Sequence, residues 1–451
     1  MKLLALIVSA IAMTATAAHA QDATEFKNGG EFRARYENFV NKTAADNGQA
    51  EQHTDARVKW DVNVRKGEKL QAHVTLLHNA RFGGAPVISD DTTSGQQLKY
   101  ATADNNGLAV NRAWGWWRAT DAVSFKVGRI GIDFADGSVF SENDWEAVPY
   151  AFEGLNAAFD TSFAMFNLYG VKLAELGANP GGNSDSEANL YMATMDLKNM
   201  PSAIKMANIH LIDSVRNSTA TAGSANWQHI GATIGGDTAG IMYKVTGALQ
   251  FGSFSKNDFV PAPTTPEQTL SASMLDAMVG YGMPETMGLK ASVGYHIDSG
   301  DDNNAGQYAQ TGDDKQNNYQ TLYYDKHNNA GLMDVVRWGN LTYLHVNASI
   351  MPMEDLEAGI GYYLFNKSKS GGTTNFGRGI TNTLNTAAPA TTNSDTALGS
   401  EVDVFANKAY GPDLKIGARY SVFMASDALK NITPKQDKTA HGAYLQASIT
   451  F

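Results

Sequence analysis

Residues 55–65 read Asp-Ala-Arg-Val-Lys-Trp-Asp-Val-Asn-Val-Arg. Apolar and polar residues alternate through the whole stretch, with Val58, Trp60 and Val62 on the apolar side. Because successive side chains of a β-strand point to opposite faces, the stretch predicts a strand with one apolar and one polar face. A soluble sandwich and a membrane-spanning barrel both use such strands, so the number and spacing of the repeats decide between them.

The same alternation returns along the chain and predicts about 18 strands. They are expected at 30–40, 54–65, 69–82, 108–119, 122–131, 150–160, 162–173, 188–198, 202–213, 226–235, 239–255, 269–282, 287–297, 338–350, 355–366, 400–409, 413–424 and 441–451. Two of these stretches are irregular, because neither face of 108–119 is clearly apolar and 202–213 is mixed.

The connections between these stretches alternate between short turns, such as Lys66-Gly67-Glu68, and long loops, such as 83–107. Outer-membrane barrels have short periplasmic turns and long outer loops, whereas a soluble sandwich has no reason to separate its connections in this way. The pattern therefore predicts an all-β fold, a transmembrane antiparallel up-and-down β-barrel of about 18 strands, with 16 as the alternative count. Such a closed sheet pairs every backbone group within the membrane and leaves no edge.

The two ends of the chain indicate where it goes. Met1-Lys2, the apolar stretch 3–13 and Ala18-His19-Ala20 have the order of a secretory signal peptide, and the apolar stretch is shorter than the ~20 residues that span a bilayer. We expect residues 1–20 to be removed and residues 21–451 to form one barrel domain in the outer membrane of a Gram-negative cell. The final amphipathic stretch ends at Phe451, as in chains recognised by the barrel-assembly machinery, which we expect as a partner together with outer-membrane lipid and lipopolysaccharide.

Composition excludes several classes of function. Only 43% of the residues are hydrophobic and the net charge is −11, which argues against a helical membrane protein and against nucleic acid as a partner. The charge is uneven, with a net of +2 in residues 21–130 and −14 in residues 131–451. The chain has no cysteine, so it can form neither a disulfide nor a thiolate metal site.

A barrel of this size is too wide for side chains to fill and leaves an aqueous channel. Charged residues that alternate with apolar ones should line it. They are Glu31, Arg33, Arg35, Glu37, Arg57, Lys59, Asp61, Arg65, Arg81, Lys126, Lys290, Glu357, Glu401, Asp403, Lys415 and Arg419. Rings of charge set the ion preference of a pore, and the alternative is that opposite charges pair across strands and stiffen the wall. Arg129 has the apolar parity of its strand and should lie at the outer rim.

Aromatic residues are candidates for the girdles that sit at the lipid headgroups. The candidates are Tyr36, Trp114, Trp116, Trp117, Tyr362 and Tyr420. For Trp114 and Trp116 packing in the lumen remains the alternative, because they share a face with Arg112 and Arg118.

The third long loop, 132–149, is rich in acidic and aromatic residues. In many porins the third outer loop folds inward and narrows the pore, and we expect the same here. Its acids would then face basic strand residues such as Arg33, Arg35, Arg57 and Lys59 across a constriction; they are Asp133, Asp136, Glu142, Asp144 and Glu146. The alternative is a loop that caps the outer surface.

No enzyme signature is present, since the chain lacks G-x-S-x-G, H-E-x-x-H, Walker A and G-x-G-x-x-G patterns. His210 with Asp213 and Asp325 with His327 could be mistaken for catalytic pairs, but no nucleophile accompanies them. The acidic runs at 298–302 and 313–314 lack the ligand order of a calcium loop and are expected to be solvated. We therefore expect no catalytic residues, no metal and no cofactor, and the alternative for the acidic runs is Ca²⁺ that bridges them to anionic surface sugars.

One block of the sequence resembles the bacterial alginate-export barrel family. The block consists of Val127-Gly-Arg-Ile-Gly131, Asp136-Gly137, Trp145 and Phe152-Glu-Gly154, within a similar stretch of about 30–160. Ile130 and Glu153 stand where that family has Gln and Asp. The resemblance implies an 18-stranded monomeric channel that exports an anionic polysaccharide through a pore lined by Arg and Lys, a role that Arg33, Arg35, Arg57, Lys59 and Arg129 would suit.

The acid-rich remainder of the chain does not match the basic pore of such an exporter. The first expectation is therefore a porin, a water-filled channel for passive diffusion of ions and small hydrophilic solutes. The alternatives are a selective alginate-like export channel and a non-conducting surface protein or barrel enzyme.

Overall fold

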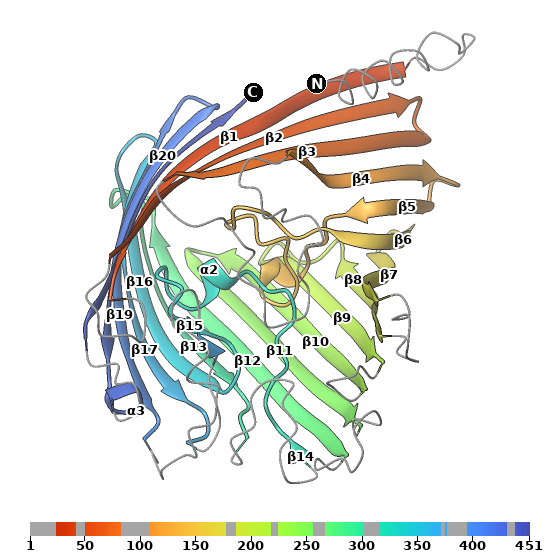
Figure 1. Ribbon diagram of the computed structural model, residues 1–451. Coiled ribbons are helices and arrows are strands. Elements are labelled where there is room, and N and C mark those ends of the chain that lie inside the picture. The colour runs from red at the N-terminus through yellow and green to blue at the C-terminus, as the bar shows by residue number, and fades with distance from the viewer. Residues whose placement is uncertain are drawn as a thin grey trace.

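The computed structural model describes residues 24–41, 50–82, 108–176, 186–217, 224–255, 267–301, 315–370, 375–376, 395–430 and 438–451. Within these residues, eighteen long antiparallel strands close into one barrel (Figure 1). Each expected stretch is a strand, so the predicted fold class and the count of 18 are confirmed. The proposed signal peptide, residues 1–20, lies outside the described residues.

The barrel strands are β1 (Thr24–Val40), β2 (Ala50–Lys66), β3 (Leu70–Phe82), β4 (Leu108–Arg118), β5 (Val123–Ile130), β6 (Phe152–Asp160), β7 (Ala164–Leu176), β8 (Ser186–Leu197), β9 (Ile204–Arg216), β10 (Ala225–Thr238), β11 (Ile241–Phe254), β12 (Gln268–Met283), β13 (Leu289–Asp298), β16 (Leu341–Met353), β17 (Leu356–Lys367), β19 (Ala397–Tyr410), β20 (Leu414–Ala425) and β21 (Ala440–Thr450). The short elements are η1 (Ala135–Gly137), β14 (Lys315–Gln316), α2 (Lys326–Asn329), β15 (Val336–Arg337), β18 (Asn375–Phe376) and α3 (Asp427–Lys430). The turn after every second barrel strand is short, so the alternation of connections read from the sequence is present in the fold.

The barrel closes where β1 pairs with β21, over the register from Glu31 opposite Thr450 to Val40 opposite His441. Gly30 exchanges two backbone hydrogen bonds with Phe451, at 2.8 and 3.1 Å. A Cβ at Gly30 would lie 2.3 Å from the carbonyl oxygen of Lys59 and 2.8 Å from the Phe451 ring, so only glycine fits this close approach. β1 begins at Thr24, before the predicted start at residue 30. Gly29 and Gly30 carry no side chains, so they interrupt the alternation from which the strand was predicted.

Apolar side chains cover the outer face of the barrel. Trp117 is 51% exposed, and Tyr36, Tyr362 and Tyr420 are also exposed on this face, where the girdle was expected. Trp114 instead lies inside, stacked on His73 with ring centroids 4.9 Å apart, so the lumen alternative holds for this residue.

A β-bulge explains why the β4 stretch was ambiguous in the sequence. The register between β3 and β4 shifts at Thr75, so that Asn111 is an extra residue between Val110 and Arg112. An extra residue reverses the alternation of faces, and no face of the whole stretch then reads as apolar. The bulge also directs the buried Asn111 amide inward, where it donates a 3.1 Å hydrogen bond to the Pro149 carbonyl.

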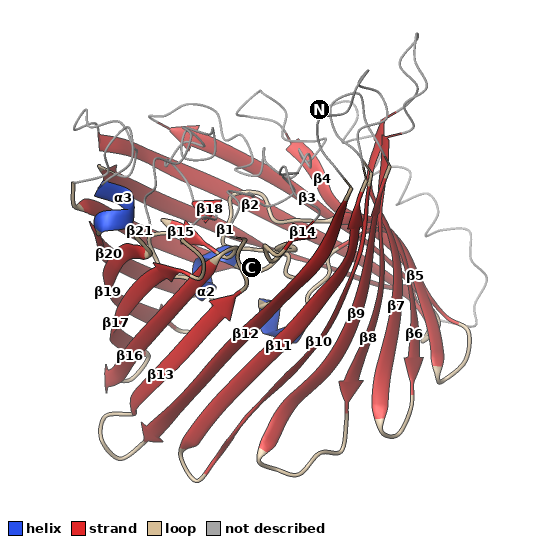
Figure 2. Ribbon diagram, turned by 90° about the horizontal axis from the view of Figure 1, so that it is seen from below, coloured by secondary structure: helices blue, strands red, loops and turns tan. Residues whose placement is uncertain are grey.

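The packed hydrophobic core lies inside the barrel. It joins inward residues of the wall, such as Leu190 and Trp227, to aromatic residues of two loops, such as Phe140 and Tyr323. Figure 2 shows these loops, with α2, enclosed by the ring of strands. Among the described residues, the helices are too short to cross a bilayer.

Candidate functional site: a constriction between two inner loops

Two long loops fold into the lumen and meet there. The first inner loop is residues 131–151, between β5 and β6, and the second inner loop is residues 315–340, between β13 and β16. Backbone hydrogen bonds join them, from the Ser141 amide to the Tyr323 carbonyl at 2.5 Å and from the Asp325 amide to the Gly137 carbonyl at 2.8 Å. The two loops therefore form one connected body inside the barrel.

The first inner loop rests on a group of cations on β1 and β2 that we call the basic cluster, consisting of Arg33, Arg35, Arg57 and Lys59. The guanidinium groups of the three arginines donate hydrogen bonds of 2.8–3.0 Å to three successive carbonyl oxygens, those of Asp144, Trp145 and Glu146. Arg33, Arg35 and Arg57 are all buried. A carbonyl carries no net charge, so these bonds hold the loop without neutralising Arg33, whereas Arg57 also pairs with the carboxylates of Glu31 and Asp144, and Arg35 with that of Glu37.

The Trp145 ring is held in a stack of planar groups. His327 of α2 lies parallel to it with ring centroids 3.6 Å apart, and the Arg35 guanidinium lies 3.4 Å from the ring centroid. Arg419 of β20 approaches the same ring at 4.6 Å and contacts His327. Burial lowers the pKa of His327 although Asp334 opposes the effect, so the imidazole stays neutral at pH 7 between two guanidinium groups.

The acids of the first inner loop do not all face the basic cluster as expected. Asp144 does, with its carboxylate 2.9 Å from Lys59 Nζ and 3.2 Å from Arg57. Glu142 pairs with Arg112 of β4 and Asp136 with Lys244 of β11. The Asp133 carboxylate accepts a hydrogen bond from the Glu142 amide. Glu146 contacts the basic cluster through its backbone carbonyl. Asp144, Glu142 and Asp136 thus meet basic strand residues, as expected, but the last two meet walls other than the basic cluster, because the loop crosses the lumen. The expectation was wrong for the Asp133 carboxylate, which bonds within its own loop.

The second inner loop is held mainly by carboxylates of the wall. The Asp298 carboxylate accepts from the Gly339 and Leu341 amides at 2.7 and 2.6 Å. Glu401 and Asp403 of β19 accept from the Met333 and Leu332 amides at 2.9 and 3.1 Å. The wall thus bonds carbonyl groups of the first loop and amide groups of the second, and the carboxylates of Asp144, Glu142 and Asp136 add side-chain contacts to the first.

The expectation that the acids near residue 300 are solvated was also wrong. Asp298 and Asp301 are buried, and Asp301 accepts a 2.8 Å hydrogen bond from the Asn317 amide. The acids at 302, 313 and 314 lie outside the described residues. The two pairs that could be mistaken for catalytic ones have structural roles. His210 contacts His229, and Asp325 caps the N-terminus of α2.

The remaining cations assigned to the lumen fall into two groups. Arg81, Lys126 and Arg419 lie at the level of the loops; Arg81 forms a paired contact with Asp55 at 2.8 and 3.0 Å, and Lys126 lies 4.7 Å from the Trp114 ring centroid. Arg65, Lys290 and Lys415 are exposed near the short turns at the other end of the lumen. Arg129 lies at the outer end of β5 with Glu153, as its parity suggested.

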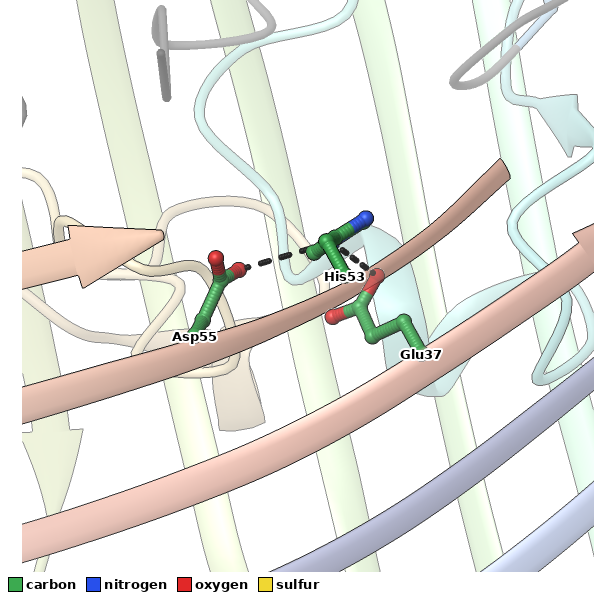
Figure 3. A group of neighbouring side chains, drawn as sticks. All are labelled: Glu37, His53 and Asp55. Atoms are coloured by element: carbon green, nitrogen blue, oxygen red, sulfur yellow. Dashed lines mark ion pairs between the residues drawn. The ribbon is translucent and has the colours of Figure 1, made fainter. Parts of the chain in front are cut away.

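Glu37, His53 and Asp55 gather on β1 and β2 beside the basic cluster (Figure 3). His53 Nε2 lies 3.3 Å from Glu37 and 3.7 Å from Asp55. Three such groups could ligate a cation, but Arg35 and Arg81 already contact the two carboxylates. The two guanidinium charges balance the two carboxylate charges, so this group is an ion-pair network that stiffens the wall.

The stability of the stack on Trp145 should depend on pH. Since the pKa of His327 is lowered in the folded loop, a released loop binds more protons below about pH 6.5, and each further unit of acid weakens the stack by up to about 1.4 kcal/mol until His327 is protonated. We expect single-channel current to become noisier as the pH falls from 7.5 to 5.5. Asp144 does not interfere, because Arg57 and Lys59 outweigh its burial and keep its pKa below the ordinary value.

The matched control for this prediction is His327→Phe, which keeps a flat ring on Trp145 but cannot be protonated. Its current noise should not change between pH 7.5 and 5.5. An equal response of the wild type and the variant would show that His327 is not the titrating group.

The model of the family described as "Alginate export" matches residues 25–443. No curated protein matches the chain. The fold is similar to Pseudomonas aeruginosa OccK8 (OprE), with 13% sequence identity, 95% of this chain and 98% of that chain covered, and a TM-score of 0.57.

Two further Pseudomonas aeruginosa structures share the fold. The outer membrane protein OpdK has 10% identity, the same coverage of 95% and 98%, and a TM-score of 0.58. OccK2 (OpdF), solved in complex with glucuronate, has 10% identity, coverage of 95% and 98%, and a TM-score of 0.58. At these identities the similarity shows the barrel architecture itself.

Proposed function

The chain belongs to the alginate-export family of outer-membrane barrels, and on this premise we propose that it is a porin that conducts ions and small hydrophilic solutes and favours carboxylate anions. The observation that carries the proposal is the basic cluster, which stands on the lumen wall at the level where the inner loops narrow the passage. Both hydrogen bonds of Arg33 end on carbonyl oxygens, so its charge adds to the field felt by a passing solute.

The size of the solute is limited by the inner loops. They touch β1 and β2 through the basic cluster, and β11 through Lys244, so they bridge the lumen from one side to the other. A conducting channel of this design passes its solutes beside this body. A small anion would meet the exposed Lys415 and Lys290 at the short-turn end, and at the constriction it would compete with Asp144 for the Lys59 ammonium.

Glucuronate is the first solute to test, because OccK2 was solved with it and it combines a carboxylate with a sugar ring. In planar bilayers we expect glucuronate to reduce the chloride current in a concentration-dependent way, while glucose, of nearly the same size, leaves it unchanged. Equal effects of the two sugars would contradict the anion preference. A protein that inserts without passing current would contradict the channel itself.

Export of an anionic polysaccharide is the second candidate, and membership of the family favours it. A polymer needs one continuous path through the lumen, whereas the inner loops bridge it, so we rank this candidate below the porin. Block of the current by micromolar uronate oligomers, at concentrations where monomeric glucuronate has no effect, would reverse the ranking. An enzymatic role is not proposed, because His210 and His327 have structural partners rather than a nucleophile.

A further inference from the structure

The outer face of the barrel has a hollow across β9, β10, β11 and β12. One cross-strand row of side chains there reads Ile209, Ala232, Gly247 and Leu275, with large residues at its ends and small residues in the middle. Ile209 and Leu275 are 40% and 43% exposed, which places the row on the face turned toward lipid. The whole hollow, from this row to Ser299 and Lys369, holds about 760 Å³, a size typical of small-molecule sites.

This hollow opens toward the outer side of the membrane. β11 runs from a short turn at its first residue to a long loop at its last, so Leu249 lies further out than Gly247. Ser299 and Gly300, in the long loop after β13, border the hollow at its outer end. Its occupant therefore comes from the outer leaflet rather than the inner one.

A cation stands at the outer end of the hollow. Lys369 borders it and is exposed. The backbone of Lys369 is held on both sides by Asn340, whose amide oxygen accepts from the Lys369 N–H at 2.7 Å and whose amide nitrogen donates to the Lys369 carbonyl at 3.0 Å. Asn340 thus fixes the backbone of Lys369 at the outer end of the hollow, the end that faces the lipid headgroups of the outer leaflet.

We propose that this hollow is a binding site for lipid A, the phosphorylated and multiply acylated anchor of lipopolysaccharide. An acyl chain fills the space over Ala232 and Gly247, and a phosphate meets Lys369. An apolar floor with a cation at its outer end matches the two parts of this lipid, whereas the wall of a second barrel is convex and would not fill the hollow.

The chain offers a sharp variant to test the site. A Cβ at Gly247 would meet only one atom within 4 Å, the Met274 carbonyl oxygen at 3.9 Å, so Gly247→Leu fills the hollow without a clash. The matched control is Gly115→Leu on β4, an exposed glycine whose Cβ would meet nothing within 4 Å. Both variants add the same side chain to the outer wall, and only one of them adds it in the hollow.

The experiment is native mass spectrometry of the full-length protein in detergent, titrated with purified lipid A and, separately, with phosphatidylglycerol. We expect lipid A to bind the wild type and Gly115→Leu equally, and Gly247→Leu roughly tenfold or more weakly. Lys369→Glu should weaken lipid A roughly fivefold to tenfold. Heat-modifiable migration of every variant on gels verifies that the barrel has assembled.

Three results would overturn the proposal. The first is equal lipid A binding by the Gly247→Leu and Gly115→Leu variants. The second is phosphatidylglycerol binding as tight as that of lipid A, which would make the hollow a general lipid contact. The third is a wild-type oligomer that Gly247→Leu converts to a monomer, which would assign the hollow to a second copy of the chain.

Discussion

Arg57→Gln should release the first inner loop and enlarge the channel. The Arg57 guanidinium is buried and bonds the carbonyls of Asp144 and Glu146, the Asp144 carboxylate and Glu31. Removing one partner of a buried charge pair costs about 3–5 kcal/mol. The fraction of molecules with a released loop then rises roughly a hundredfold to a thousandfold or more, and single-channel conductance should rise several-fold with added noise.

Two controls separate this effect from a general loss of positive charge. Arg65→Gln removes a guanidinium from the same strand at an exposed position beside a turn, and its conductance should stay at the wild-type level. Arg57→Lys keeps the charge but loses the planar guanidinium, which bonds two carbonyls through one nitrogen and two carboxylates through the other. Its conductance should lie between those of Arg57→Gln and the wild type. An Arg57→Gln channel with wild-type conductance would show that the loop does not depend on this anchor.

Asp298→Ala should have a comparable effect through the second inner loop. Its buried carboxylate accepts from the Gly339 and Leu341 amides and lies 3.2 Å from His296 Nε2. The substitution leaves two buried amides without their acceptor, at a cost of about 1–3 kcal/mol for each group. Because the two inner loops pack on each other, we expect larger and more variable conductance steps than in the wild type.

Asp237→Ala is the matched control, since it removes an exposed carboxylate at the turn between β10 and β11. It should leave the conductance unchanged. Asp298→Asn keeps one acceptor oxygen and should fall between the alanine variant and the wild type. If Asp298→Ala and Asp237→Ala give the same step size, the wall carboxylate does not hold the second loop.

The barrel could be predicted from the sequence because its signal is local. In a strand such as β2 each side chain reports its own face, and the lipid side must be apolar at every second position. The prediction weakened where the geometry departs from that rule. Asn111 inserts a residue and exchanges the two faces, while Gly30 carries no side chain that could report a face.

Much less of the constriction could be predicted, for a physical reason. The cations of the basic cluster were identified by their parity in β1 and β2, and the inward loop by its acids. The bonds that hold the loop, however, go to the backbone carbonyls of Asp144, Trp145 and Glu146, and any sequence has such groups. Composition suggested that the acids of the loop meet basic strand residues, but it could not indicate that Glu142 pairs with Arg112 and Asp136 with Lys244 rather than with the basic cluster.

The second inner loop was missed because its charges look like those of a solvated loop. Asp298 and Asp301 stand in an acidic run, and nothing in a single sequence distinguishes a carboxylate that caps buried amides from one that faces water. The dense aromatic content of 319–343, including Tyr323, Trp338 and Tyr343, was the available signal. Large aromatic residues in a long outer loop indicate packing, and inside a wide barrel the lumen is a place where they can pack.

The most direct measurement is single-channel recording of the wild type and of an Arg57→Gln/Asp298→Ala double variant in planar bilayers under a KCl gradient. The account predicts small, steady, anion-preferring steps for the wild type, and several-fold larger, noisier steps with weaker anion preference for the double variant. Equal step sizes and equal reversal potentials in the two proteins, or no steps in the wild type, would contradict it.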